Sequence, residues 1–230
     1  MRNLHITLLL LLSCATLNAQ DISGAWKRNL DTAVQYLTLV DHYFVLTTFD
    51  LDEKKFYYTR GGTANLNGKF MTGVIEFNTL NKSEVKSTYS YEYSFAKKDL
   101  NIAFNGNTTS WTWVDDGQVG LAGYWRITGR MQDGNIVKMN PGARKTIKTL
   151  SGSRFQWTAI NTETGEFFGT GGGQYTFKDG KYTEHIEFFS RDSSRVGSSL
   201  TFDAELKNGD WHHSGKSSKG DPIYEVWSRR

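Results

Sequence analysis

The stretch GTGGGQYTFKDGKYTEHIEFF at residues 169–189 decides the fold class of this chain. Its glycine-rich start has the composition of a phosphate-binding loop, but such a loop leads into the N-terminus of a helix. Here an alternating pattern follows instead, with Tyr175 and Phe177 on one face and a hairpin turn at Asp179-Gly180. We therefore predict that the glycines belong to a sharply bent strand in which backbones approach closely.

The same pattern occurs twice along the 230 residues. RGGTANLNGKFMTGVIEF at residues 60–77 matches GGGQYTFKDGKYTEHIEF at residues 171–188, and ISGAWKR at 22–28 matches LAGYWRI at 121–127. Repetition at this spacing predicts two related domains. We place them at residues 20–117 and 118–230, after an N-terminal segment at residues 1–19.

Each half divides into short alternating segments separated by turn signals. The second half gives eight such segments about every ten residues, with a second hairpin signal at Asn208-Gly209 and no helical period. Eight antiparallel strands in meander order can close on themselves, which removes exposed strand edges. The predicted fold is therefore all-β, with two tandem antiparallel eight-stranded meander barrels.

Composition and charge exclude several classes of partner. The chain has 27 Lys and Arg against 24 Asp and Glu, so a dedicated nucleic-acid surface is not expected. After the N-terminus there is no run of about 20 apolar residues, and we predict no membrane span.

The N-terminus has the pattern of a secretory signal peptide. Arg2 precedes the short apolar run ITLLLLLS, and small residues follow in CATLNAQ. We predict cleavage between Ala19 and Gln20 and a periplasmic or secreted protein without cysteine. LLSC loosely resembles a lipobox, so a lipid anchor at Cys14, and hence an outer-membrane lipoprotein, is the less favoured alternative.

A Gly-x-Trp motif that opens an eight-stranded meander resembles the lipocalin and calycin barrels. In that family the Trp closes the base of the barrel, and an Arg from the last strand packs over it. Trp26 and Trp125 match the Trp, and Arg229 or Arg230 matches the Arg in the second half. The first half has Asp115 and Asp116 in the place of the Arg, so the match fails there.

Residues 121–230 also resemble a family of exported bacterial proteins of uncharacterised function. The motifs that carry this resemblance are PGARKTIK, FQW, TGGGQYT, DGKYTEHIEF, WHHSGK and EVW. It implies a lipocalin-like fold, and a fold alone does not supply a function.

Strand alternation predicts an aromatic interior with a few polar groups in the second barrel. Such a lining is typical of a ligand site, and a buried carboxylate there needs a partner or stays neutral. The alternative interpretation is a satisfied ion pair near a wet barrel mouth. Lys145 and Lys148 lie on opposite faces of their strand, so one of them is a candidate partner for Glu184. The candidate ligand-binding residues are Trp157, Tyr175, Tyr182, Glu184, His213, Glu225 and Trp227.

An ungapped alignment of the repeats assigns each polar candidate a counterpart in the first half. It pairs Glu184, His213, Glu225 and Trp157 with Thr72, Phe104, Trp111 and Val45 respectively. The first half then lacks the polar set, and we place the site in the second barrel. The first barrel is expected to be a packed structural partner or to hold a more apolar ligand.

Three hypotheses for function follow from these patterns. The first is an exported binding protein that holds a small hydrophobic or aromatic ligand in the second barrel. The second is a lyase, isomerase or hydrolase that uses Glu184 and His213 as a catalytic acid–base pair. The third is a structural or interaction module. We predict no cofactor and no metal site, since the adjacent His212 and His213 point to opposite faces of a strand.

Overall fold

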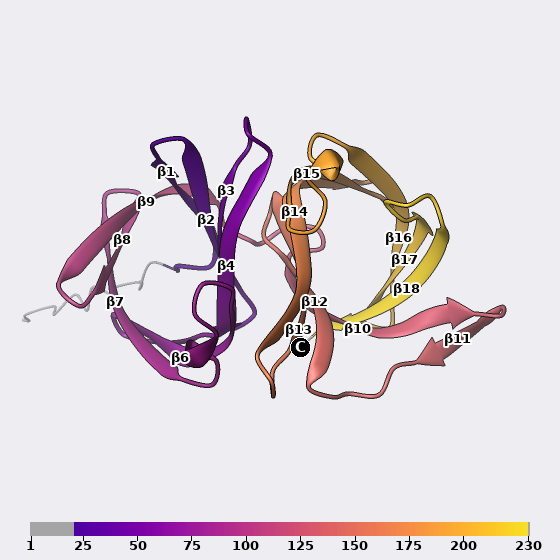
Figure 1. The fold of residues 1–230 in the computed structure, drawn as a ribbon, viewed down its shortest axis with the longest axis horizontal. Coiled ribbons are helices and arrows are strands. Elements are labelled where there is room, and N and C mark those ends of the chain that lie inside the picture. The colour runs from indigo at the N-terminus through magenta and orange to yellow at the C-terminus, as the bar shows by residue number, and fades with distance from the viewer. Residues whose placement is uncertain (1–20, 230) are drawn as a thin grey trace, which may run out of the picture.

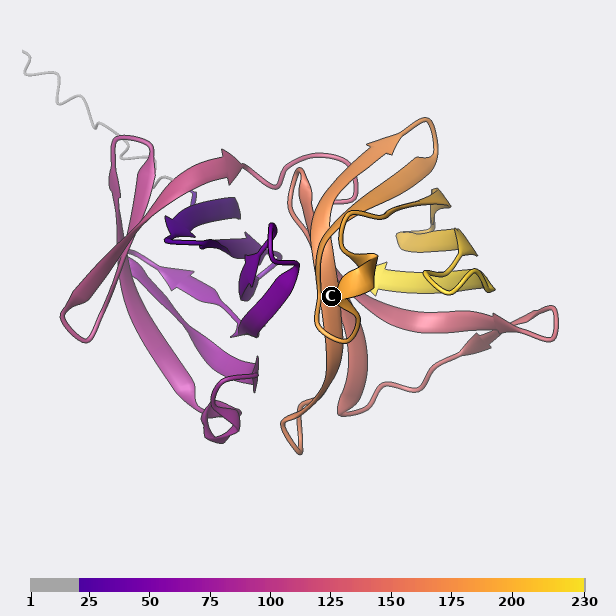
Figure 2. The ribbon, with the colours of Figure 1, turned by 45° about the horizontal axis from the view of Figure 1, so that its top comes forward.

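A computed structural model describes residues 21–229 and contains two closed barrels side by side (Figures 1 and 2). The elements of the first barrel are β1 (Gly24–Leu30), β2 (Ala33–Val40), β3 (Tyr43–Asp50), β4 (Lys55–Thr63), β5 (Asn65–Asn67), β6 (Phe70–Asn78), η1 (Lys82–Glu84), β7 (Thr88–Ala96), β8 (Asp99–Phe104) and β9 (Asn107–Asp115). The elements of the second are β10 (Gly123–Gln132), β11 (Asn135–Lys138), β12 (Arg144–Leu150), β13 (Arg154–Asn161), β14 (Glu166–Lys178), β15 (Lys181–Phe189), η2 (Ser193–Arg195), β16 (Ser199–Lys207), β17 (Asp210–Lys216) and β18 (Pro222–Arg229).

Both barrels are antiparallel meanders of eight strands, each with one extra strand. The first closes through the pairing of β4 with β6, and β5 is its extra strand. The second closes through β10 and β18, and β11 is its extra strand. The predicted fold class is therefore confirmed. In the part of the chain that the structure describes, no helix is long and apolar enough to cross a membrane.

The glycine-rich stretch lies in strand β14, as the alternation predicts. A Cβ on Gly172 would lie 2.5 Å from the ring of Phe188, and a Cβ on Gly173 would lie 2.0 Å from the carbonyl oxygen of His185. A bulge separates these two glycines in the pairing with β15. The absence of side chains thus lets the strand bend against its neighbours, which is what closes a barrel corner.

The first barrel repeats this arrangement. A Cβ on Gly61 would meet the ring of Phe77 at 2.6 Å, and a Cβ on Gly62 would lie 1.9 Å from the carbonyl oxygen of Val74. A bulge again separates the two glycines. Both halves of the repeat therefore bend at the same place by the same means.

The two Gly-x-Trp tryptophans are equivalent as well. The indole nitrogen of Trp26 donates to the Ile22 carbonyl at 2.8 Å, and that of Trp125 donates to Leu121 at 2.9 Å. The guanidinium of Arg229 lies over the Trp125 ring at 5.0 Å. The predicted Arg–Trp contact is thus present in the second barrel.

The barrels pack on each other through a third core at their junction. Tyr43 and Tyr124 stack with their ring centroids 4.2 Å apart, and Phe49 lies 4.8 Å from Phe188. At the centre, the Gln156 amide joins side chains of both barrels: its oxygen accepts from Thr47 at 2.6 Å and its nitrogen donates to Thr59 at 3.1 Å. These buried contacts hold the two barrels together.

The carboxylate of Asp115 also joins the barrels. It accepts hydrogen bonds from Ser151, Gly152 and Ser153 at the β12–β13 turn of the second barrel. Asp115 is not the counterpart of Arg229 that the sequence comparison suggested: Trp26 pairs with Trp113 and Trp125 pairs with Arg229, so Trp113 stands in the place of the Arg.

Strand register corrects the ungapped alignment of the repeats. Trp26 pairs with Leu37 and Trp125 pairs with Lys148, so Leu37 corresponds to Lys148. The same reasoning across the other ladders gives Gly73 for Glu184, Ile102 for His213, Thr109 for Glu225 and Leu46 for Trp157. The ungapped assignments are therefore wrong, because the connections of the two barrels differ in length. Thr72 and Val45 are one residue away from the true counterparts, which places their side chains on the other face, and Phe104 and Trp111 are two residues away.

Candidate functional site

The residues predicted for the second barrel gather in one core. Five are buried, and Trp157 and Glu225 are half-buried. Aromatic rings contact one another throughout this core, for example Tyr182 with Trp211 at 5.0 Å and Trp211 with Trp227 at 6.1 Å. The buried members are Tyr175, Tyr182, Glu184, His213 and Trp227.

A buried ion pair lies at the centre of this core. The Nζ of Lys148 is 2.9 Å from Oε1 of Glu184, and both side chains are almost fully buried. The ammonium also lies within 6 Å of four aromatic ring centres, those of Tyr182, Phe202, Trp211 and Trp227. Ring faces attract a cation, so carboxylate and rings together satisfy the charge. Of the two lysines considered as partners for Glu184, Lys148 forms the pair and Lys145 contacts Glu76 at the barrel junction.

His213 has a different carboxylate partner. Its Nδ1 lies 3.6 Å from Oε2 of Glu225, whose other oxygen is 3.3 Å from Arg130. Burial and the nearby Lys148 charge lower the pKa of His213, so its ring is neutral at neutral pH. Burial raises the pKa of Glu225, but the His213 ring and Lys148 outweigh this and hold that pKa below its usual value.

The structure thus joins Glu184 and His213 to different partners in a packed interior. Among the described residues, both ring nitrogens of His213, the Tyr182 hydroxyl and the Trp211 indole nitrogen are buried without a hydrogen-bond partner. The prediction of a ligand or of acid–base chemistry at these residues stays a prediction.

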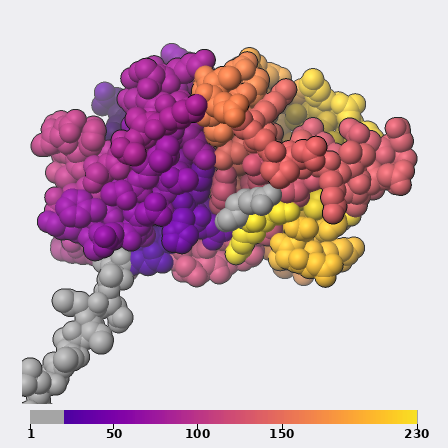
Figure 3. Space-filling view, turned by 90° about the horizontal axis from the view of Figure 1, so that it is seen from below, coloured from indigo at the N-terminus to yellow at the C-terminus, as the bar shows by residue number. Residues whose placement is uncertain are grey.

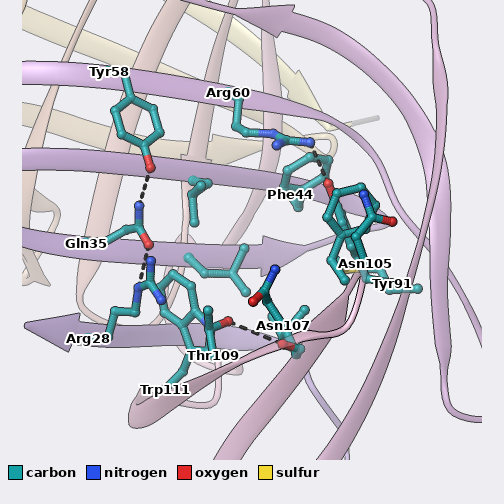
Figure 4. Close-up of a pocket in the computed structure, with 15 residues that line it drawn as sticks. Arg28, Gln35, Phe44, Tyr58, Arg60, Tyr91, Asn105, Asn107, Thr109 and Trp111 are labelled. Carbon is teal, nitrogen blue, oxygen red and sulfur yellow. Dashed lines mark hydrogen bonds between the residues drawn. The ribbon is translucent and has the colours of Figure 1, made fainter. Parts of the chain in front are cut away.

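A cavity of about 440 Å³ lies in the first barrel (Figure 4). Its floor is apolar and is formed by Leu37, Phe44, Leu46, Met71 and Ile102. Its rim includes Phe104, Asn105 and Asn107 at the β8–β9 turn, which are exposed to solvent. The cavity therefore opens at this end of the barrel.

The two barrels distribute side-chain volume differently over corresponding positions. At corresponding positions the first barrel has the smaller residue five times, while the backbone pairing is the same. The pairs are Leu37 for Lys148, Leu46 for Trp157, Ala64 for Tyr175, Met71 for Tyr182 and Leu100 for Trp211. At other positions the first barrel has the larger residue, and these pairs are Arg60 for Gly171, Tyr89 for Leu200, Tyr93 for Ala204 and Phe104 for Gly215. The hollow lies beside Leu37, Leu46 and Met71, where the second barrel has part of its aromatic core.

Arg28 is the first of two arginines in the cavity wall. Its Nε donates to the Gln35 side chain at 2.7 Å, and its guanidinium lies over the Trp111 ring at 5.1 Å. Gln35 in turn donates to Tyr58 at 2.5 Å, which fixes this side of the wall (Figure 4). Among the described residues, Arg28 has no carboxylate within 4 Å.

Arg60 is the second arginine in the cavity wall. It donates to the Tyr91 hydroxyl at 2.6 Å, and the nearest carboxylate, that of Glu84, is 4.0 Å away. Its Nε is buried without a hydrogen-bond partner in the described chain. No Asp or Glu is among the residues that line the cavity. The wall is consequently positive and contains guanidinium donors that have no hydrogen-bond acceptor among the described residues.

Sequence reasoning missed both arginines, although a signal was present. Arg28 follows Trp26 by two residues in β1, and Arg60 follows Tyr58 by two in β4. Residues at this spacing share a face of a strand, so the alternation indicates that both arginines face the barrel interior.

Comparison with known proteins leaves the family open. No family model matches the chain, and no curated protein matches it. Among solved structures, an uncharacterized protein from Bacteroides eggerthii aligns with 47% of this chain and 99% of its own length, at 14% identity and a TM-score of 0.33. That similarity is too low to support an inference about function.

Proposed function

We propose that this protein binds a small amphipathic molecule with an anionic group in the cavity of the first barrel. The observation that carries the proposal is the pair of arginines, Arg28 and Arg60, in the wall of an otherwise apolar cavity that has no carboxylate in its lining. Half-buried cations in a cavity whose lining holds no carboxylate favour an anionic ligand.

The size and lining of the cavity fit such a ligand. Small-molecule sites commonly enclose about 300–1,000 Å³ and combine an apolar lining with a few placed polar groups. An apolar tail would contact Leu37, Leu46 and Met71, and a carboxylate or a similar group would accept from the guanidinium donors of Arg28 or Arg60. Burial of the tail supplies affinity, and the arginines supply selectivity for an anion.

The test is a calorimetric titration with octanoate, and with 1-octanol as a neutral analogue of the same chain length. We expect octanoate to bind more tightly than 1-octanol, and Arg28→Gln or Arg60→Gln to weaken octanoate binding by about tenfold or more, since a hydrogen bond to a charged group is lost. Binding of 1-octanol should hardly change. The control variant is Arg130→Gln in the second barrel. Equal binding of both probes, or unchanged octanoate binding in both arginine variants, would contradict the proposal.

We extend the proposal to family and compartment. The contact of Arg229 with Trp125 supports a lipocalin-type barrel. The signal-peptide pattern at residues 1–19, which lies outside the described residues, supports export to the periplasm or beyond. N-terminal sequencing of the mature protein tests the compartment: a start near Gln20 supports cleavage, and a lipid-modified Cys14 supports the lipoprotein alternative.

A further inference from the structure

The second barrel has an insertion that the first barrel lacks. In the first barrel, Trp26 pairs with Leu37, which follows it by 11 residues. In the second, Trp125 pairs with Lys148, which follows it by 23. The 12 additional residues form the end of β10, the turn at Asp133 and the short strand β11, which together project from the barrel (Figures 1 and 3).

This hairpin exposes apolar side chains on both of its faces. Met131 pairs with Ile136 on one face, and Arg130 pairs with Val137 on the other. Met131, Ile136, Val137 and Met139 are each between 40% and 45% exposed. A two-stranded ribbon is marginally stable alone, and these residues belong to none of the barrel cores. Their exposure indicates a surface that something apolar covers.

The base of the hairpin is strongly basic. A hollow of about 340 Å³ between β10, residues 139–143 and β12 is lined by Arg126, Arg130, Arg144 and Lys145, with no carboxylate in its lining. Arg130 contacts Glu225 and Lys145 contacts Glu76, whereas Arg126 and Arg144 have no carboxylate within 4 Å among the described residues. Asp133 is the single acidic residue between positions 123 and 147.

We propose that the hairpin of β10 and β11 docks this protein on an anionic lipid surface. Its apolar residues would enter the interfacial region of the bilayer, and the basic residues behind them would contact anionic headgroups. A lipid layer surrounds both faces of an inserted ribbon, which matches the apolar residues on both faces.

Co-sedimentation of the full chain with vesicles tests this proposal. One set of vesicles contains phosphatidylcholine alone, and the other contains phosphatidylcholine mixed with phosphatidylglycerol. We expect binding to the mixed vesicles and binding at least about fivefold weaker to the neutral ones, since each basic residue near an anionic surface contributes about that factor. The double variant Ile136→Ser/Val137→Ser should reduce binding by about tenfold or more, and Arg144→Gln by about fivefold.

Matched controls separate the hairpin from other surfaces. Leu206→Ser changes an apolar residue of β16 that is 51% exposed, and it should bind vesicles like the parent. Arg28→Gln should also leave vesicle binding unchanged, so failure here and failure of the first-barrel proposal are distinguishable. All these positions are exposed or half-buried, and thermal melts check that each variant folds.

Several results would overturn the proposal. One is that the protein does not sediment with the mixed vesicles, and another is that Leu206→Ser loses as much vesicle binding as the hairpin variants do. A third is that the hairpin variants bind vesicles as the parent does while inorganic phosphate abolishes binding, which indicates a small-anion site alone. A dimer that depends on Ile136 and Val137, without vesicle binding, would instead assign the hairpin to self-association.

Discussion

The two barrels share a backbone design but differ in whether a carboxylate neutralises the cations inside them. In the second barrel, Lys148 is neutralised by Glu184 and enclosed by aromatic rings. In the first barrel, Leu37 and Gly73 stand at those two positions, while Arg28 and Arg60 enter the wall without a carboxylate in the lining. The same strand ladders thus support a packed core around a neutralised lysine in one half and an open, positively charged cavity in the other. The interior side chains, and not the fold, decide which half contains an open cavity.

The largest expected difference between the barrels concerns the buried ion pair. Lys148→Met leaves the Glu184 carboxylate buried without its partner, and we expect a loss of about 3–5 kcal/mol in the free energy of unfolding. Adding Glu184→Leu to this variant should restore most of the loss. Leu37→Met, at the corresponding position of the first barrel, should cost less than about 1.5 kcal/mol. Urea unfolding measures the stability of all three variants. If Lys148→Met alone is as stable as Leu37→Met, the Lys148–Glu184 pair does not have the role in stability that we assign to it.

The glycine bends should be equally intolerant of side chains in both barrels. A Cβ would approach backbone oxygen to 1.9 Å at Gly62 and to 2.0 Å at Gly173. We expect Gly62→Ala and Gly173→Ala each to cost at least about 3 kcal/mol, because the colliding atom is backbone and cannot rotate away. Gly142→Ala is the control, since no atom lies within 4 Å of its added Cβ. Tolerance at one of the two bends, measured by urea unfolding, would break their equivalence.

The pH dependence of stability should have a component from the second barrel. The pKa of His213 is lower in the folded protein than its ordinary value of about 6.5, so the unfolded chain binds the proton more readily. Stability should therefore fall as the pH decreases below about 6.5, by up to about 1.4 kcal/mol for each pH unit. The lowered pKa of Glu225 acts in the same direction, but only at and below its ordinary value near 4.5.

Two variants isolate the histidine component in denaturant titrations between about pH 7.5 and pH 5.5. His213→Ile introduces the residue type of the corresponding Ile102, and it should flatten the pH dependence. His185→Gln changes an exposed ring and should keep the parent profile. If both variants keep the parent slope, another group is responsible for it.

The smallest effect on stability is expected from filling the cavity. Met71→Tyr introduces the side chain that the second barrel has at Tyr182, and it should change the free energy of unfolding by no more than about 1 kcal/mol. Octanoate binding should nevertheless be lost, because the new ring occupies the apolar floor. Paired thermal melts and calorimetric titrations check this, and a variant that still binds octanoate like the parent would place the ligand elsewhere.

Sequence alone predicted the backbone better than the site. Gly172 and Asp179-Gly180 indicated a bent strand followed by a hairpin, and the alternation placed Tyr182 and His213 inside the barrel, since these signals are local. Which barrel contains a cavity depends instead on where side chains from many strands place their volume. That placement requires the strand register, which the unequal connections between the strands obscure in an ungapped alignment. The alternation around Trp26 did contain a signal for Arg28.

An NMR titration of the isotope-labelled protein with octanoate tests most directly whether the first barrel is the binding site. We expect the backbone amide signals that shift to belong to β1, β4 and the β8–β9 turn, around Arg28, Arg60 and Asn105. Shifts centred instead on β15 and β17, around Tyr182 and His213, would show that the second barrel accepts the ligand and would contradict the assignment of the site to the first.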